Sequence, residues 1–139
     1  MAQIARQSGA LYVVDNTFLS PALQQPISLG ADLVLHSTTK YINGHSDVVG
    51  GAAIAATPEL AETLTWWANC LGITGGPFDS FLTLRGVRTL QTRMRQHEES
   101  ASLLANVLNE QATVRRVNFP GLTSHPGHAI ARRQQSGFG

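Results

Sequence analysis

The sequence predicts an α/β fold, in which short buried strands alternate with helices. Residues 11–14 and 33–35 are short apolar runs of the kind found in buried parallel strands. Turn-forming or polar residues close each run, and residues 16–31 between them are enough for a crossover connection. Helical patterns follow downstream, and strands that alternate with helices are typical of a parallel sheet.

The elements of the first half can be assigned in order. The opening residues resemble the last turns of a helix that ends at Gly9. After the two apolar runs, residues 48–56 form a third strand with very small side chains. Pro58 then begins a helix that reaches about Leu71, because proline is tolerated in the first turn of a helix.

The second half is predicted to be mainly helical. A shorter helix over 78–84 precedes a long amphipathic helix over 89–109. The apolar stripe of the longer helix consists of Leu90, Met94, Leu103, Leu104, Val107 and Leu108. Residues 113–117 are predicted as a strand and residues 128–133 as a short helix. This helix, strand, helix order predicts that a second domain begins after about Glu98.

Composition restricts the class of protein. The chain has 139 residues and a formal net charge of +1, which gives no reason to expect nucleic acid or an anionic membrane as a partner. No apolar run approaches the ~20 residues of a membrane span. The single cysteine, Cys70, excludes an intrachain disulfide and suits a reducing cytoplasm. We therefore expect a soluble cytoplasmic protein.

The candidate catalytic and cofactor-binding residues lie at the ends of two predicted strands. Asp15 ends the first strand, and the segment 37–40 ends the second. Neighbouring strands lie ~4.8 Å apart and open α/β sheets bind ligands at this edge, so a carboxylate and the amine of Lys40 could flank a pyridine ring. Pyridoxal chemistry needs this pair: the lysine forms a Schiff base, and the carboxylate keeps the ring nitrogen protonated. Lys40 is also the only lysine in the chain.

Hydroxyl groups near the same edge could bind a phosphate. Ser37 and Thr39 share one face if their segment is extended, whereas Thr38 points the other way. Thr17 could add another hydroxyl. Taken singly, these features also fit an ordinary turn, a polar loop and a solvated lysine.

Other side chains that could bind a metal or a ligand are interpreted as structural. The spacing of His36, His45 and Asp47 matches no strong zinc pattern, and we predict no metal site. The pair 66–67, two tryptophans, is interpreted as core plus interface. Cys70 is interpreted as a small buried hydrophobic residue.

Longer sequence motifs resemble those of a known enzyme family. Residues 36–46 (HSTTKYINGHS) resemble the cofactor-attachment signature of the Cys/Met-metabolism pyridoxal-phosphate enzymes, and residues 13–18 (VVDNTF) resemble the family's pyridine-nitrogen motif. Residues 72–80 and 84–90 resemble later blocks of the same family. The resemblance extends over the whole chain. Segments such as 66–69 (WWAN) most resemble the bacterial cystathionine γ-synthases of this family.

The resemblance implies a fold and a set of site residues. The fold is that of fold type I, the aspartate aminotransferase-like transferases that depend on pyridoxal 5'-phosphate. Residues 1–98 would form the latter part of the large cofactor-binding domain, with its parallel or mixed sheet, and residues 99–139 the beginning of the C-terminal domain. The implied site residues are Lys40 as the Schiff-base lysine, Asp15 as the ring-nitrogen partner, Ser37 and Thr39 as phosphate ligands, and Thr17 as a further cofactor-binding residue.

The resemblance also implies a reaction. It is γ-replacement, in which O-succinylhomoserine and cysteine give cystathionine and succinate, and Lys40 is the base for the α-proton. A sister C–S lyase or O-acylhomoserine sulfhydrylase activity remains an alternative, as does a non-catalytic piece that binds only cofactor or a partner subunit. Family members are homotetramers with shared sites and longer chains. Both ends of this sequence look cut, and we expect a fragment that lacks the stacking aromatic and the carboxylate-binding arginine of the family.

Overall fold

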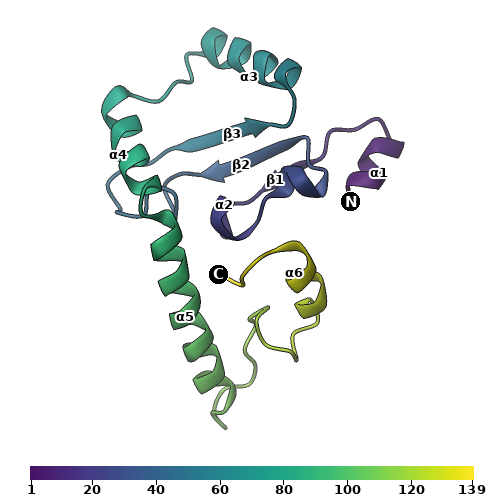
Figure 1. Cartoon of the computed structure of the whole chain (residues 1–139), viewed down its shortest axis with the longest axis vertical. Helices are drawn as coiled ribbons and strands as arrows, with labels where there is room; N and C mark the ends of the chain where they lie inside the picture. The colour runs from purple at the N-terminus through teal and green to yellow at the C-terminus, as the bar shows by residue number, and fades with distance from the viewer.

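A computed structural model describes residues 1–139 as a small mixed sheet with helices around it (Figure 1). Its elements in chain order are α1 (Ala2–Gln7), β1 (Val13–Asp15), α2 (Ser20–Leu23), the 3-10 helix η1 (Pro26–Leu29), β2 (Leu33–Ser37), β3 (Gly51–Ala55), α3 (Pro58–Leu71), α4 (Pro77–Val87), α5 (Leu90–Asn109) and α6 (His128–Gln134). The predicted α/β class is confirmed. The predicted helix over 58–71 has the observed bounds of α3.

The sheet has the order β1-β2-β3. Strand β1 pairs with β2 in parallel, so that Asp15 lies opposite Leu35, and the crossover between them contains α2 and η1. Strand β3 runs antiparallel to β2, with Ser37 opposite Gly51. The chain therefore leaves β2 and returns to β3 at one edge of the sheet, which is also where β1 ends.

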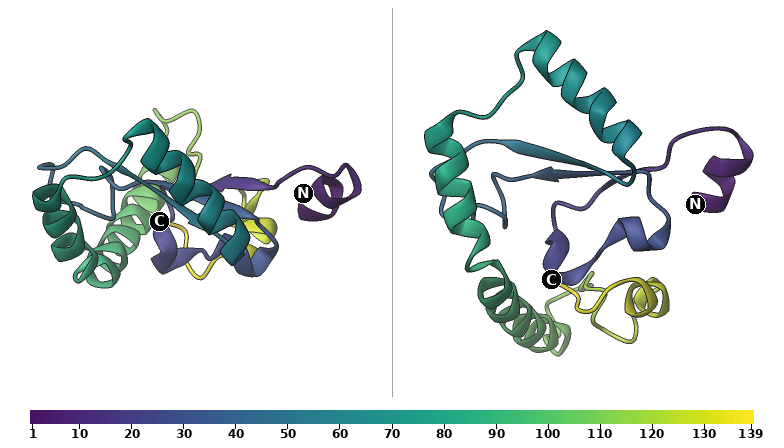
Figure 2. Two further views of the ribbon diagram at one scale, coloured as in Figure 1. Left: turned by 90° about the horizontal axis from the view of Figure 1, so that it is seen from above. Right: turned by 45° about the horizontal axis from the view of Figure 1, so that its top comes forward.

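Helices lie on both sides of the sheet. The views of Figures 1 and 2 agree that α3 lies along one face, whereas α2 and the C-terminal residues lie on the other side. Helix α5 extends away from the sheet, and its first turns pack on α2 (Figure 1). Its buried residues Leu90 and Met94 form a small apolar cluster with Leu23.

Several apolar side chains that were expected in the core are exposed, and the expected interface role of the two tryptophans stays a prediction. Trp66 and Trp67 on α3 are 58% and 51% exposed, and Cys70 is exposed as well. The C-terminal half of the predicted stripe on α5 is exposed too: Leu103, Leu104, Val107 and Leu108. Periodicity shows which residues share a face of a helix, but another element must cover that face to bury it.

One expected strand is absent: residues 113–117 form no strand, and the C-terminal segment 137–139 forms none either. A strand requires a partner for its backbone groups, and no other strand lies beside either segment. The backbone N–H of Phe138 instead donates to the Glu98 carboxylate at 2.8 Å. Helix α5 continues through residue 98, and the division of the chain there stays a prediction.

None of the helices combines the length and the apolar character that crossing a bilayer requires.

Candidate cofactor site

The ends of β1 and β2 are joined by hydrogen bonds beyond their regular ladder. The backbone N–H of Asn16 donates to the carbonyl of Leu35 at 2.9 Å, which continues the parallel pairing past Asp15. The hydroxyl of Thr17 then accepts a hydrogen bond of 2.8 Å from the backbone N–H of Ser37. The predicted proximity of the two strand ends is therefore confirmed.

Asp15 presents an ionised carboxylate at this edge. Its Oδ1 accepts a 2.9 Å hydrogen bond from the backbone N–H of Thr17. Hydrogen bonds from the side chain and the backbone of Thr17 hold the pKa of Asp15 below its ordinary value, and the nearby His36 acts in the same direction. An exposed carboxylate that stays charged is the group that a protonated pyridine nitrogen needs as a partner.

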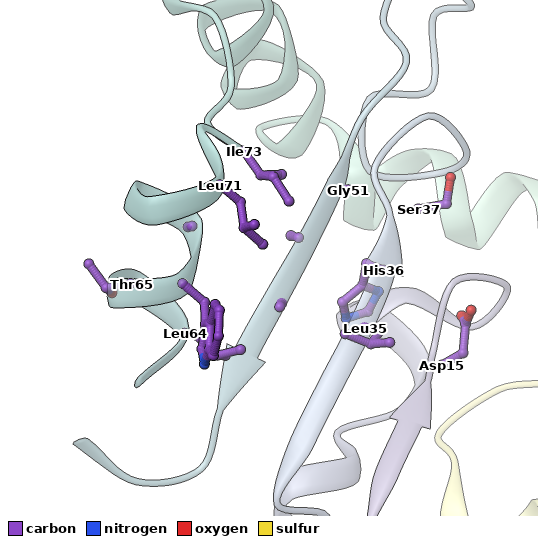
Figure 3. Close-up of a pocket in the computed structure, with 13 residues that line it drawn as sticks. Asp15, Leu35, His36, Ser37, Gly51, Leu64, Thr65, Leu71 and Ile73 are labelled. Carbon is purple, nitrogen blue, oxygen red and sulfur yellow. The ribbon is translucent and has the colours of Figure 1, made fainter. Parts of the chain in front are cut away.

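A hollow of about 730 Å³ opens between the sheet and α3, and Asp15 and Ser37 lie on its rim (Figure 3). Its apolar wall comes from β3 and α3 and includes Ala53, Leu64 and Leu71. The Ser37 hydroxyl makes no hydrogen bond within the chain. It is therefore available to a ligand, in contrast to the backbone N–H of the same residue, which Thr17 holds.

The chain turns directly after Ser37. The backbone N–H of Lys40 donates to the carbonyl of Ser37 at 3.3 Å, and that of Asn43 donates to Thr38 at 2.9 Å. The segment 37–39 is therefore not extended, and the condition under which Ser37 and Thr39 would share a face is not met. As a result, Ser37 and Thr39 do not line the same hollow.

Thr39 uses its hydroxyl within the chain. The hydroxyl accepts from the backbone N–H of Gly50 at 3.0 Å and donates to the Gly50 carbonyl at 3.2 Å. Because a hydroxyl has one proton, Thr39 can donate to a phosphate only after it releases the Gly50 carbonyl.

Lys40 is exposed and lines a second hollow, of about 670 Å³, together with Thr39. Its amine has no hydrogen-bond partner within the chain. Asp15 and Ser37 line the first hollow, so the structure brings the five candidate residues to one edge of the sheet but divides them between two hollows. Thr17 is buried and lines neither of these hollows.

Sequence reasoning missed the residues that hold the Lys40 turn. Arg93 of α5 donates to the carbonyls of Tyr41 and Gly86 at 2.7 and 2.8 Å. Asn43 is fully buried, and its amide nitrogen donates to Asp47 at 2.6 Å. The available signal was Arg93 itself, a charged residue directly before the buried Met94 in an amphipathic helix.

Comparisons with known proteins agree with this geometry. The family model of the Cys/Met metabolism PLP-dependent enzymes matches residues 1–139. Cystathionine gamma-synthase from Escherichia coli (strain K12) is 55% identical over all of this chain, which corresponds to 36% of that protein. Cystathionine gamma-lyase from Bacillus subtilis (strain 168) is 48% identical over the whole chain and 37% of its own length.

Solved structures of such enzymes have the same fold. In a crystal structure of cystathionine gamma synthase from Xanthomonas oryzae pv. oryzae, in complex with aminoacrylate and cysteine, 35% of the chain matches 99% of this one. The TM-score is 0.97 and the sequence identity 66%.

The chain belongs to the Cys/Met metabolism PLP-dependent enzyme family. It spans about a third of the length of the curated relatives named above. Pyridoxal phosphate is the cofactor of this family, and two groups at the strand edge fit it: the charged Asp15 carboxylate and the unoccupied Ser37 hydroxyl.

Proposed function

We propose that this chain supplies the lysine-bearing part of a pyridoxal-phosphate site. The observation that carries the proposal is the junction of two adjacent parallel strand ends, where Thr17 connects the Asp15 carboxylate to the segment that leads to Lys40. When bound, pyridoxal phosphate supplies an aldehyde that condenses with amines and a ring that accepts electrons.

Each candidate residue has a distinct task in this proposal. Lys40 attaches the cofactor, and Asp15 keeps the proton on the ring nitrogen. Ser37 donates its free hydroxyl to the phosphate, and Thr39 does so after its hydroxyl leaves Gly50. Thr17 contributes mainly by orientation, since its hydroxyl already accepts from the Ser37 backbone.

Lys40 is also the proposed base. Once the amine of a substrate replaces it, the freed amine can take the proton from the substrate's α-carbon and return a proton at the neighbouring carbon. The four-carbon side chain is flexible, and its exposed amine has no partner in the chain that would restrain it. These properties suit a group that moves protons between two carbons.

The proposed overall reaction is γ-replacement: O-succinylhomoserine and cysteine give cystathionine and succinate. The identity to cystathionine gamma-synthases supports it. The identity to cystathionine beta- and gamma-lyases supports a sister activity, C–S cleavage. Sulfhydrylation of an O-acylhomoserine is a second alternative, and it would use the same lysine and carboxylate. A third alternative is a chain that binds the cofactor without turnover, for which the residues at the ends of β1 and β2 would be enough.

Product analysis with and without thiol tests this proposal. The chain is loaded with pyridoxal phosphate and incubated with O-succinylhomoserine, alone and with cysteine, and a Lys40→Ala variant serves as the control. Cystathionine and succinate that form only with cysteine and Lys40 support γ-replacement. Keto acid and ammonia in equal amounts with or without cysteine favour a lyase. No product from the loaded chain contradicts a catalytic role for this chain alone.

We further propose how the chain is organised and where it acts. Residues 1–98 belong to the cofactor domain, and residues 99–139 begin the C-terminal domain. We propose a homotetrameric enzyme with sites shared between subunits. Cytoplasmic localisation is supported by the free, exposed Cys70, which suits a reducing compartment.

A further inference from the structure

Arg93 binds the backbone of the turn that carries Lys40. Its Nη1 donates to the carbonyl of Tyr41 at 2.7 Å, and its Nη2 donates to the carbonyl of Ile42 at 3.4 Å. The same Nη2 donates to Gly86 at 2.8 Å, at the end of α4. One guanidinium therefore connects three carbonyls from two segments that lie far apart in the sequence.

The position of Arg93 is energetically unfavourable for a positive charge. It lies in the first turn of α5, where the helix dipole already places partial positive charge and disfavours a cation. It is also half-buried, and burial lowers the pKa of its guanidinium. Carbonyl acceptors compensate such a buried cation, and the Nε–H also donates to the Thr89 hydroxyl at 3.1 Å, which fixes the plane of the fork.

The turn packs so closely against α4 and α5 that two contact positions have no room for a side chain. Gly44 has a positive φ of 72°, and a Cβ there would overlap Nη1 of Arg93. A Cβ on Gly86 would overlap the carbonyl oxygen of Asn43. The turn over 38–44 is therefore in close contact with both α4 and Arg93.

We propose that Arg93 is a positioning residue, which fixes the backbone directly after Lys40 so that the lysine amine is presented to the cofactor. Arg93 acts through the carbonyls of Tyr41 and Ile42 and touches neither substrate nor cofactor in this proposal. The role of Arg93 in presenting Lys40 to the cofactor rests on the proposed function. The stabilisation of the turn by Arg93 does not, because it is a property of the cofactor-free chain.

Hydrogen exchange of the cofactor-free chain tests the fixing of the turn. The amides of Asn43 and Gly44 donate within the turn, to Thr38 at 2.9 Å and to Lys40 at 2.8 Å, and report its opening. In Arg93→Ala we expect these two amides to exchange about tenfold faster or more, since hydrogen bonds to a charged group are lost. Amides of the β1–β2 ladder keep their rates.

Matched variants distinguish the effect of the planar guanidinium of Arg93 from the effect of its positive charge. Arg95→Ala removes an exposed arginine two positions further along α5 and should leave all the amides unchanged. Arg93→Lys keeps the charge but lacks the planar fork, so it should restore the exchange rates only in part. It also serves as the test if Arg93→Ala fails to fold. Unchanged exchange at Asn43 and Gly44, or equal acceleration of every amide, would overturn the proposal.

The rate of cofactor attachment tests the purpose of the fixed turn. The chain is mixed with pyridoxal phosphate, reduced with borohydride at intervals, and the adduct on Lys40 is quantified by peptide mass. We expect Arg93→Ala to react about tenfold more slowly than the parent chain. Millimolar guanidinium should restore the rate by filling the vacated space, whereas ammonium should not.

The two measurements keep the two proposals separable. An equal rate in Arg93→Ala and the parent chain, or a reduced rate that guanidinium does not restore, would overturn the positioning role. If the parent chain itself gives no adduct, the proposed cofactor function fails. The exchange rates of Asn43 and Gly44 then still decide whether Arg93 fixes the turn.

Discussion

The hydroxyl oxygen of Thr17 accepts a 2.8 Å hydrogen bond from the backbone N–H of Ser37. Through this contact a buried side chain that follows β1 fixes the last residue of β2. The backbone N–H of Thr17 donates at the same time to the Asp15 carboxylate. The single residue Thr17 therefore contacts both the Asp15 carboxylate, the proposed ring-nitrogen partner, and the last residue of β2 before the turn that carries Lys40.

Replacement of Thr17 by valine should destabilise the chain. The change keeps the shape of the side chain but leaves the N–H of Ser37 without an acceptor, which costs about 1–3 kcal/mol. Urea denaturation measures the free energy of unfolding, and Thr17→Ser, which retains the hydroxyl, is the control. A stability of Thr17→Val equal to that of the parent chain would show that this contact contributes nothing.

The same variant should change the pKa of Asp15. Since the hydrogen bonds of Thr17 hold that pKa low, their weakening should raise it toward the ordinary carboxyl value of about 3.9. NMR titration of the Asp15 carboxyl measures the change. An unchanged pKa in Thr17→Val would mean that the hydroxyl has no part in keeping the carboxylate ionised.

Stability should fall as the pH drops below about 6.5, the ordinary pKa of histidine. Burial lowers the pKa of His36 in the folded chain, so in this range the unfolded chain binds more protons and is favoured. This contribution is absent above the ordinary pKa and grows until the pH reaches the folded value. Thermal melts between pH 7 and 5 should show the loss, and His36→Gln should reduce it. An identical pH dependence in both proteins would exclude His36 as its source.

Gly86→Ala should destabilise the chain although alanine is the better helix former. In an exposed helix this change stabilises by about 1 kcal/mol, but here the new Cβ would overlap the carbonyl of Asn43. We expect a net loss of about 1–3 kcal/mol, as is typical of overpacking. Gly76→Ala is the control, because a Cβ at Gly76 lies 3.8 Å from the nearest atom of Asp79. Equal stabilities of the two variants would contradict the tight contact at Gly86.

Ser37→Ala and Thr39→Val should separate ligand binding from support of the turn. The Ser37 hydroxyl has no partner in the chain, so its loss should weaken the retention of pyridoxal phosphate with little change in stability. Thr39→Val removes two hydrogen bonds to Gly50 and should destabilise the cofactor-free chain by about 1–3 kcal/mol. Equilibrium dialysis and urea denaturation measure the two effects. A destabilised Ser37→Ala variant would contradict a free hydroxyl.

The parts of the fold that local patterns determine could be predicted from the sequence. The apolar runs before Asp15 and Ser37 indicated adjacent parallel strands, and Pro58 marked the beginning of α3. The contacts that hold the turn around Lys40 could not be predicted, because they come from Arg93, more than fifty positions away in the sequence. No local pattern contains a contact of this range.

Burial was predicted least well. The tryptophans of α3 and the second half of the stripe on α5 have apolar spacing but no covering element, and they remain exposed. The expected strand at 113–117 failed for the same reason, since an extended segment needs a neighbour. Thr39 shows the corresponding difficulty for polar residues: its hydroxyl is evident from the residue type, but only the fold shows that Gly50 occupies it.

Borohydride trapping of pyridoxal phosphate on the cofactor-loaded chain tests the central claim most directly. Because Lys40 is the only lysine, the α-amino group is the only other primary amine to account for. The account predicts one pyridoxyl group per chain, located on Lys40 by peptide mass and strongly reduced in Asp15→Ala. A folded chain that gives no adduct at Lys40, or the same adduct yield in Asp15→Ala, would contradict the claim that these two strand ends form a cofactor site.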